Sequence, residues 1–195
     1  MAEQDPLKER GRALEAEYFH RKDQELIARI RARAAAQATE RELGELTGID
    51  DAEILHELQV LGFAPGTIAL LPLMPVLQIA WAEGGVTPVE RDLIEQLATA
   101  RGIAPGSEAD AQLMDWLANR PSDEIFDGAT RLTRALLDAG SPVVGELTAE
   151  ALVHHCEQVA AASGGIFGRG RVSRDEKALL ESIATGLCAR SKSRR

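Results

Sequence analysis

The sequence has few of the residues that build β-sheets. Aromatic residues make up only 4% of the 195 residues, and Val and Ile together number 20 against 31 Ala and 24 Leu. Because Ala and Leu favour helices while β-branched and aromatic residues favour strands, this composition predicts an all-α protein. No segment shows the alternation of apolar and polar residues that is typical of a strand, which agrees with that class.

Cysteines and long apolar runs are also scarce. Cys156 and Cys188 are too few for the disulfide framework of a secreted scaffold, so we expect a reduced, cytoplasmic protein. The N-terminal segment mixes both charge signs and lacks the apolar core of a signal peptide. The most apolar run, residues 66–82, contains Pro72 and Pro75 and is short for a membrane span. It predicts a buried core helix rather than membrane insertion, and leaves peripheral membrane association open.

Charge is distributed unevenly along the chain. The 31 acidic residues outnumber the 22 Lys and Arg, for a net charge of −9, which argues against a nucleic-acid-binding protein. The balance is −1 over residues 1–48, −13 over residues 49–168 and +5 over residues 169–195. The chain therefore has an acidic body, and we expect residues 191–195 to form a disordered basic tail.

One long helix is expected at the N-terminus. Residues 7–46 contain no Pro and only two Gly, Gly11 and Gly44, and Gly48 follows as a stop signal. Apolar residues recur at spacings near four, which predicts a narrow apolar stripe: Leu14, Tyr18, Leu26, Ile30 and Ala34. Such a helix pairs with another helix or with a second copy of the chain. We assign residues 1–65 to an N-terminal helical extension.

Caps and glycines mark the remaining helices. Capping boxes are predicted at Asp50–Glu53, Thr87–Glu90 and Ser173–Glu176, because each places a side-chain acceptor three residues before a Glu. Together with Ser and Gly punctuation they predict about eight helices in all. Those after the long helix end near the following residues: Leu61, Ala82, Arg101, Asn119, Ala139, Ser163 and Arg190.

An internal repeat of 86 residues relates two parts of the chain. Residues 86–99 align with residues 172–185, with six identities: Val86, Glu90, Leu93, Glu95, Ala98 and Thr99. Each copy reads as a helix, a glycine-containing turn and a capped helix. Agreement of glycines, caps and apolar positions predicts a structural duplication of helix–turn–helix units.

The first copy resembles a known family. The segment from Ala80 to Arg91, with the sequence AWAEGGVTPVER, is similar to the signature of the TerB-like helical family, which is named for a tellurite-resistance protein. The resemblance covers residues 66–190 and implies a compact domain of two helical hairpins. Members are linked to stress response, ion binding and membrane-associated complexes. Glu83 stands where the family has Asp, and Ser163 or Arg169 stands there in the second copy.

The two turns and several helical Glu–His pairs carry residue types that can bind a metal ion. The family's ion site points to Glu83, Glu90 and Glu176 as ligands of a weakly bound divalent cation. An EF-hand loop that fits Gly84 and Glu90 would need ligands at Ile79 and Trp81, which carry no carboxylate, so capping is the favoured role of both Glu90 and Glu176. Helix spacing also permits metal ligation by three sets of residues: Glu17 with His20, Glu53 with His56, and Glu150 with His154 and Glu157.

The second turn offers a different chemistry. Residues 164–173 are rich in glycine, and Arg169 and Arg171 precede the helix that Ser173 is expected to cap. Backbone N–H groups and arginines at a helix N-terminus suit a phosphate or an acidic partner. A plain interhelical loop is the favoured interpretation, and anion binding is the alternative.

Taken together, these observations predict a non-enzymatic TerB-like module. We expect it to act in protein interaction or ion sensing within a bacterial-type stress or envelope-associated assembly, with no resident cofactor and no nucleic acid. A homo-oligomer through the N-terminal helix fits the same expectation. Phosphate-loop, dinucleotide and nucleophile-elbow motifs are absent from the sequence. The alternatives are a di-metal helical enzyme and an anion-binding module.

Overall fold

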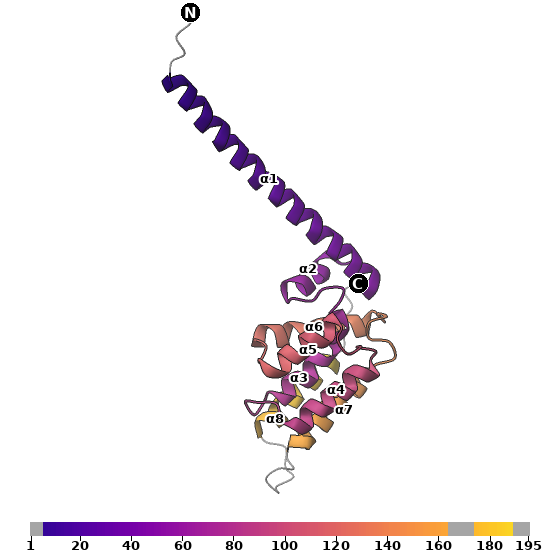
Figure 1. Cartoon of the computed structure of the whole chain (residues 1–195). Coiled ribbons are helices and arrows are strands. Elements are labelled where there is room, and N and C mark those ends of the chain that lie inside the picture. Colours follow the sequence, from indigo (N-terminus) through magenta and orange to yellow (C-terminus); the bar gives the residue numbers. More distant parts are fainter. Residues whose placement is uncertain (1–5, 164–173, 189–195) are drawn as a thin grey trace, which may run out of the picture. The chain divides into compact units, whose positions relative to one another are not determined.

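A computed structural model describes residues 6–163 and 174–188 (Figure 1). These two ranges contain eight α-helices, one 3-10 helix and no strand, which confirms the all-α class. The elements are α1 (Pro6–Thr47), α2 (Ala52–Val60), η1 (Ile68–Leu73), α3 (Met74–Ala80), α4 (Pro88–Ala100), α5 (Glu108–Ala118), α6 (Asp123–Asp138), α7 (Ala149–Ser163) and α8 (Arg174–Cys188). In the described ranges, no helix combines the length and the apolar character that a membrane span requires.

The chain divides into two compact units, Met1–Arg41 and Glu42–Arg195. The sequence placed this division after residue 65 instead. Leu43, Leu58 and Phe63 explain the difference, because all three are buried in the core of the second unit. The end of α1 and the whole of α2 therefore belong to the folded body.

Helix α1 has the predicted extent and ends as expected, since Gly48 follows it with a φ of 69°. In the first unit, the side chains from His20 to Ala38 are exposed. The apolar row of this helix is not a straight stripe. Each four-residue step turns an α-helix by about 400°, so the row rotates by about 160° between Tyr18 and Ala34. The apolar side chains therefore wind around α1 rather than facing one side.

Helix α3 is the centre of the body. It packs against α4, α6, α7 and α8, as the bundle in Figure 1 shows. Six of its seven residues are buried, and Gln78 is the exception. The apolar run thus forms the predicted core segment, but it is divided into η1 and α3. Pro72 lies inside η1 and Pro75 lies in the first turn of α3, and a proline cannot donate the backbone hydrogen bond that a continuous helix needs.

Side-chain caps set most helix starts. Thr87 and Glu90 form the predicted capping box of α4, and Ser107 and Ser122 cap α5 and α6. For α2 the cap is Asp51, which accepts hydrogen bonds from two backbone N–H groups without a reciprocal glutamate, so the predicted box from Asp50 is wrong. The predicted cap at Ser173 lies outside the described residues.

Helix α7 begins at Ala149, three residues later than predicted. The Thr148 hydroxyl accepts a hydrogen bond from the Ala151 backbone N–H at 3.1 Å and so caps this start. Gly145, with a φ of 57°, lies in the turn that precedes it. The start predicted near Glu146 is therefore wrong, because Thr148 supplies the cap of this helix.

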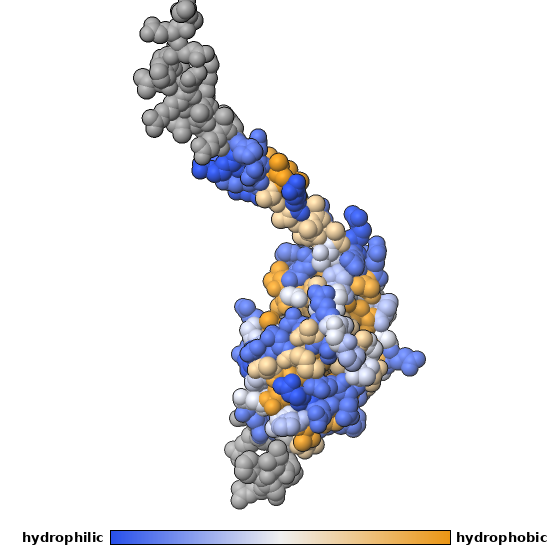
Figure 2. Space-filling view, in the orientation of Figure 1, coloured by the Kyte–Doolittle hydropathy of each residue, from blue (hydrophilic) through white to orange (hydrophobic). Residues whose placement is uncertain are grey.

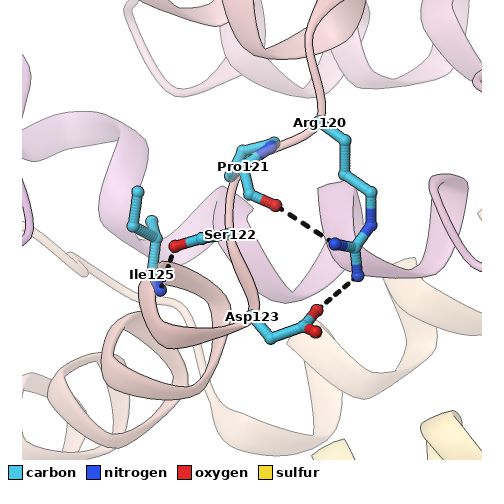
Figure 3. A network of polar contacts seen from close by, with 5 residues as sticks. All are labelled: Arg120, Pro121, Ser122, Asp123 and Ile125. Atoms are coloured by element: carbon cyan, nitrogen blue, oxygen red, sulfur yellow. Dashed lines mark hydrogen bonds and ion pairs between the residues drawn. The ribbon is translucent and has the colours of Figure 1, made fainter.

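The connection between α5 and α6 is held by Arg120 (Figure 3). Its guanidinium donates to the Pro121 carbonyl at 3.3 Å and forms an ion pair with Asp123, while the Ser122 hydroxyl accepts from the Ile125 N–H. The same guanidinium lies 5.4 Å from the centroid of the buried Phe126 ring. Arg120 therefore has both a carboxylate and an aromatic partner.

Candidate functional site

The turn between α3 and α4 contains the first two predicted metal ligands. Glu83 is exposed, and the following Gly84 has a φ of 87°. Glu90 is only 2% exposed, and its Oε2 accepts hydrogen bonds from the backbone N and the Oγ1 of Thr87 at 2.7 and 2.8 Å. The structure therefore gives Glu90 the capping role that the sequence favoured, while cation binding by Glu83 and Glu90 stays a prediction.

Glu176 aligns with Glu90 in the predicted repeat. It is also 2% exposed and lies in the first turn of α8. Among the residues whose burial the structure describes, Glu90 and Glu176 are the two charged residues in the buried class. Two positions 86 residues apart thus share an unusual environment. Arg169, Arg171 and Ser173 lie outside the described residues.

Replacing either glutamate tests whether the two positions are equivalent. We expect Glu90→Ala to lower the free energy of unfolding by about 1–3 kcal/mol, because a partly buried Thr87 N–H loses its acceptor. Glu176→Ala should cost a similar amount if the duplication is real. Urea unfolding followed by circular dichroism measures both values. The exposed Glu83→Ala is the control, and an effect of Glu176→Ala below about 0.5 kcal/mol would contradict the equivalence.

The Glu–His sets whose helical spacing permits metal ligation can be compared with the structure where it describes their side chains. Across the described residues, no group of three His, Cys, Asp or Glu side chains could hold a metal ion. His56 and Glu53 are both exposed, and the His154 Nδ1 lies 3.6 Å from a carboxylate oxygen of Glu157 on the surface of α7. His20 contacts Gln24 at 3.1 Å, and the side chain of its predicted partner Glu17 lies outside the described residues.

A surface hollow of about 620 Å³ lies between the end of α4 and the start of α7. The segment between α6 and α7 supplies most of its wall. The lining residues are Ala100, Arg101, Gly102, Pro142, Val143, Val144, Gly145, Glu146, Leu147 and Ala151. Apart from Arg101 and Glu146, the lining side chains are apolar or glycine, so the charged groups of the hollow are one guanidinium and one carboxylate.

Arg101 is the residue that ends α4, and its guanidinium is only partly satisfied. One Nη donates to the Val143 carbonyl at 3.0 Å. The Nε atom is buried and has no hydrogen-bond partner among the residues that the structure describes. Burial lowers the pKa of Arg101, because the charged form loses contact with water. The side chain thus holds a half-buried, partly desolvated positive charge beside the hollow.

The other arginines of the acidic segment differ from Arg101 in one respect. Each has a carboxylate within ion-pair distance: Arg91 with Glu95, Arg120 with Asp123, Arg131 with Glu57, and Arg134 with Asp138. Within the described part of the chain, Arg101 has none. No sequence motif distinguished it, because its position relative to Val143, 42 residues later, depends on packing.

A second hollow, of about 340 Å³, lies between α3, α6 and α8. Its polar lining includes Gln78, Asp127, Thr130 and Ser182. The Thr130 Oγ1 is buried without a hydrogen-bond partner in the described structure. The nearby Arg131 is already paired with Glu57, so this hollow offers mostly neutral hydrogen-bonding groups.

Comparison with known proteins adds no relative from which a site could be transferred. No family model, no curated protein and no solved structure matches this chain. The candidate sites are therefore defined by the geometry of the chain's own residues.

Proposed function

We propose that this chain is a non-enzymatic TerB-like binding module of a bacterial-type stress or envelope-associated assembly. In this proposal, the hairpins α3–α4 and α7–α8 are the two copies of the duplicated unit. It is supported by Glu90 and Glu176, which are both buried in the first turn of the second helix of a hairpin. Burying a carboxylate is costly unless it is well bonded, so the same choice at two repeat-related positions favours a common origin for the hairpins.

Helix α1 is the element that we propose to meet a protein partner. Leu26 and Ile30 are 56% and 60% exposed, and Tyr18 and Ile27 are also exposed. Figure 2 shows apolar side chains of α1 as a small orange group between strongly hydrophilic ones. A helix whose described side chains are all exposed over residues 20–38 gains stability when its apolar residues are covered.

The partner that best fits this helix is a second copy of the chain. Asp23, Leu26, Ile30 and Arg33 are three or four residues apart and share one face of α1. In an antiparallel pair centred on residue 28, Leu26 meets Ile30 of the other copy and Asp23 meets Arg33. The apolar centre is therefore flanked by opposite charges on both sides, which is the complementarity that an antiparallel helix pair needs.

Self-association of the full chain tests this proposal. We expect a weak, salt-sensitive dimer, because the apolar centre is short and charge pairs flank it. Arg33→Glu should raise the dimer dissociation constant at least about tenfold, because it places like charges opposite each other. The double variant Asp23→Arg with Arg33→Glu should restore the dimer, since it exchanges the two signs. Sedimentation equilibrium over a range of protein and salt concentrations measures these constants.

A control variant and two possible results that would contradict the dimer complete this test. Val60→Lys changes an exposed apolar residue of α2 and should leave the dissociation constant unchanged. A monomer at every concentration would remove the second copy as the partner. Failure of the charge exchange to restore a dimer weakened by Arg33→Glu would show that the copies meet in another register.

A further inference from the structure

We propose that the hollow beside Arg101 binds the oxyanion group of a small molecule. This site is independent of the proposed function, which concerns the hairpins and α1. Each of the two proposals can be refuted without the other. Arg101 differs from the neighbouring arginines in its ion pairing. Arg101 has no carboxylate partner in the described structure, whereas the other four arginines of residues 49–168 each have one.

The energetic reason for a ligand is the cost of a half-buried charge that no carboxylate of the described residues compensates. A buried or partly buried ion is normally paired or fully hydrogen-bonded, because removal from water is otherwise uncompensated. The Arg101 guanidinium uses one Nη donor on Val143, and its Nε is buried with no acceptor among the described residues, so a ligand would bind the remaining Nη donors. A guanidinium presents several donors in a fixed planar fork that matches the oxygens of phosphate and carboxylate.

The surroundings strengthen the attraction for an anion. Pro142, Val143, Val144 and Leu147 make the wall beside Arg101 largely apolar, so charges interact more strongly there than in water. Ala151, in the first turn of α7, also lines the hollow. The partial positive charge of this helix N-terminus adds to the field of Arg101.

One feature of the hollow opposes an anion and provides a test. Glu146 is part of the lining, and its carboxylate would repel a bound oxyanion. It forms no ion pair with Arg101. Removing this negative charge should therefore strengthen anion binding without altering the guanidinium.

The size of the hollow indicates what carries the oxyanion. The hollow is open to solvent and has a volume of about 620 Å³, which leaves room for more than one phosphate ion. The apolar wall would contact the remainder of such a molecule. The ligand class is thus a small organic phosphate or carboxylate, and inorganic phosphate is the simplest probe of its charged group.

Titration of the full chain with inorganic phosphate tests the site. We expect saturable binding by isothermal titration calorimetry, absent with chloride at the same ionic strength. Acetate in a parallel titration distinguishes a carboxylate preference from a phosphate preference. Arg101→Gln should raise the phosphate dissociation constant at least about tenfold, and Glu146→Gln should lower it several-fold. Arg120→Gln removes the same charge from a paired arginine and should leave it unchanged.

Several results would overturn the proposal. One is the absence of binding by the wild-type chain up to tens of millimolar phosphate and acetate. Another is an equal response of Arg101→Gln and Arg120→Gln. A third is loss of binding in the variant Arg169→Gln with Arg171→Gln and not in Arg101→Gln, which would move the site to the glycine-rich loop. If Arg101→Gln does not fold, the Glu146→Gln titration decides, and an unchanged dissociation constant there refutes the site.

Discussion

Phe126→Ala is expected to lower the free energy of unfolding by about 3–5 kcal/mol. Phe126 is fully buried in α6 and belongs to the main core. Truncation removes a ring from a closely packed interior and leaves a cavity that the surrounding helices fill only in part. It also removes the ring beside the Arg120 guanidinium, so the connection between α5 and α6 loses one of its contacts.

Urea unfolding with circular dichroism measures this loss. Phe126→Leu keeps most of the apolar volume and should cost clearly less than Phe126→Ala. Val60→Ala is a matched control on an exposed apolar residue and should stay within about 0.5 kcal/mol. A loss below about 1 kcal/mol for Phe126→Ala would contradict the packing of α6 in the core.

Cys156 should react with thiol reagents about a thousandfold more slowly than an ordinary exposed thiol at pH 8. Its side chain is fully buried in α7, and burial, with a smaller effect of Glu157, raises its pKa to about 12. Because the thiolate is the reactive form, roughly one Cys156 in ten thousand would be ionised at pH 8. Cys188 is exposed at the end of α8 and should react readily.

A chromogenic disulfide reagent separates the two thiols by rate. In Cys188→Ser only the slow phase should remain, and in Cys156→Ala only the fast phase. Denaturant should make the two cysteines of the wild-type chain react alike. Two fast phases in the folded protein would contradict the burial of Cys156.

The same pKa predicts how stability depends on pH. The folded-state pKa of Cys156 is raised above the ordinary value of 9.0 to about 12, so the folded state favours the neutral thiol. This contribution is fully present below pH 9 and is lost as the pH rises toward 12, by about 4 kcal/mol at the upper end. The alkaline loss of stability should therefore be smaller in Cys156→Ala than in the wild-type chain.

Signals that act within one helical turn were readable from the sequence. Thr87, Ser107 and Ser122 cap the helices that follow them, and Gly48 follows the end of α1. A cap needs only its own side chain and a backbone N–H two or three residues away, so distant residues hardly affect it. The role of Glu90 as a cap was predictable for the same reason.

The sequence identifies the long apolar run as part of the core, but it does not show how this run divides into helices. Residues 66–82 had to be buried in a chain with so few other apolar stretches, and α3 is indeed the central helix. The division into η1 and α3 depended on how Pro72 was accommodated. The Leu71 carbonyl accepts a hydrogen bond from the Thr133 hydroxyl at 3.0 Å, a contact with α6 that no local pattern contains.

Local sequence thus sets the class, most helix ends and the candidate caps of this protein, because each depends on hydrogen bonds between close neighbours in the chain. Packing decides the features that depend on remote residues. Trp81 donates to the Trp116 carbonyl at 2.9 Å, and Arg101 donates to the Val143 carbonyl at 3.0 Å. Five arginines among many acidic residues look alike in the sequence. Only the positions of α4 and α7 show which guanidinium has no counter-ion in the described part of the chain, because charge pairing is a property of distance in space.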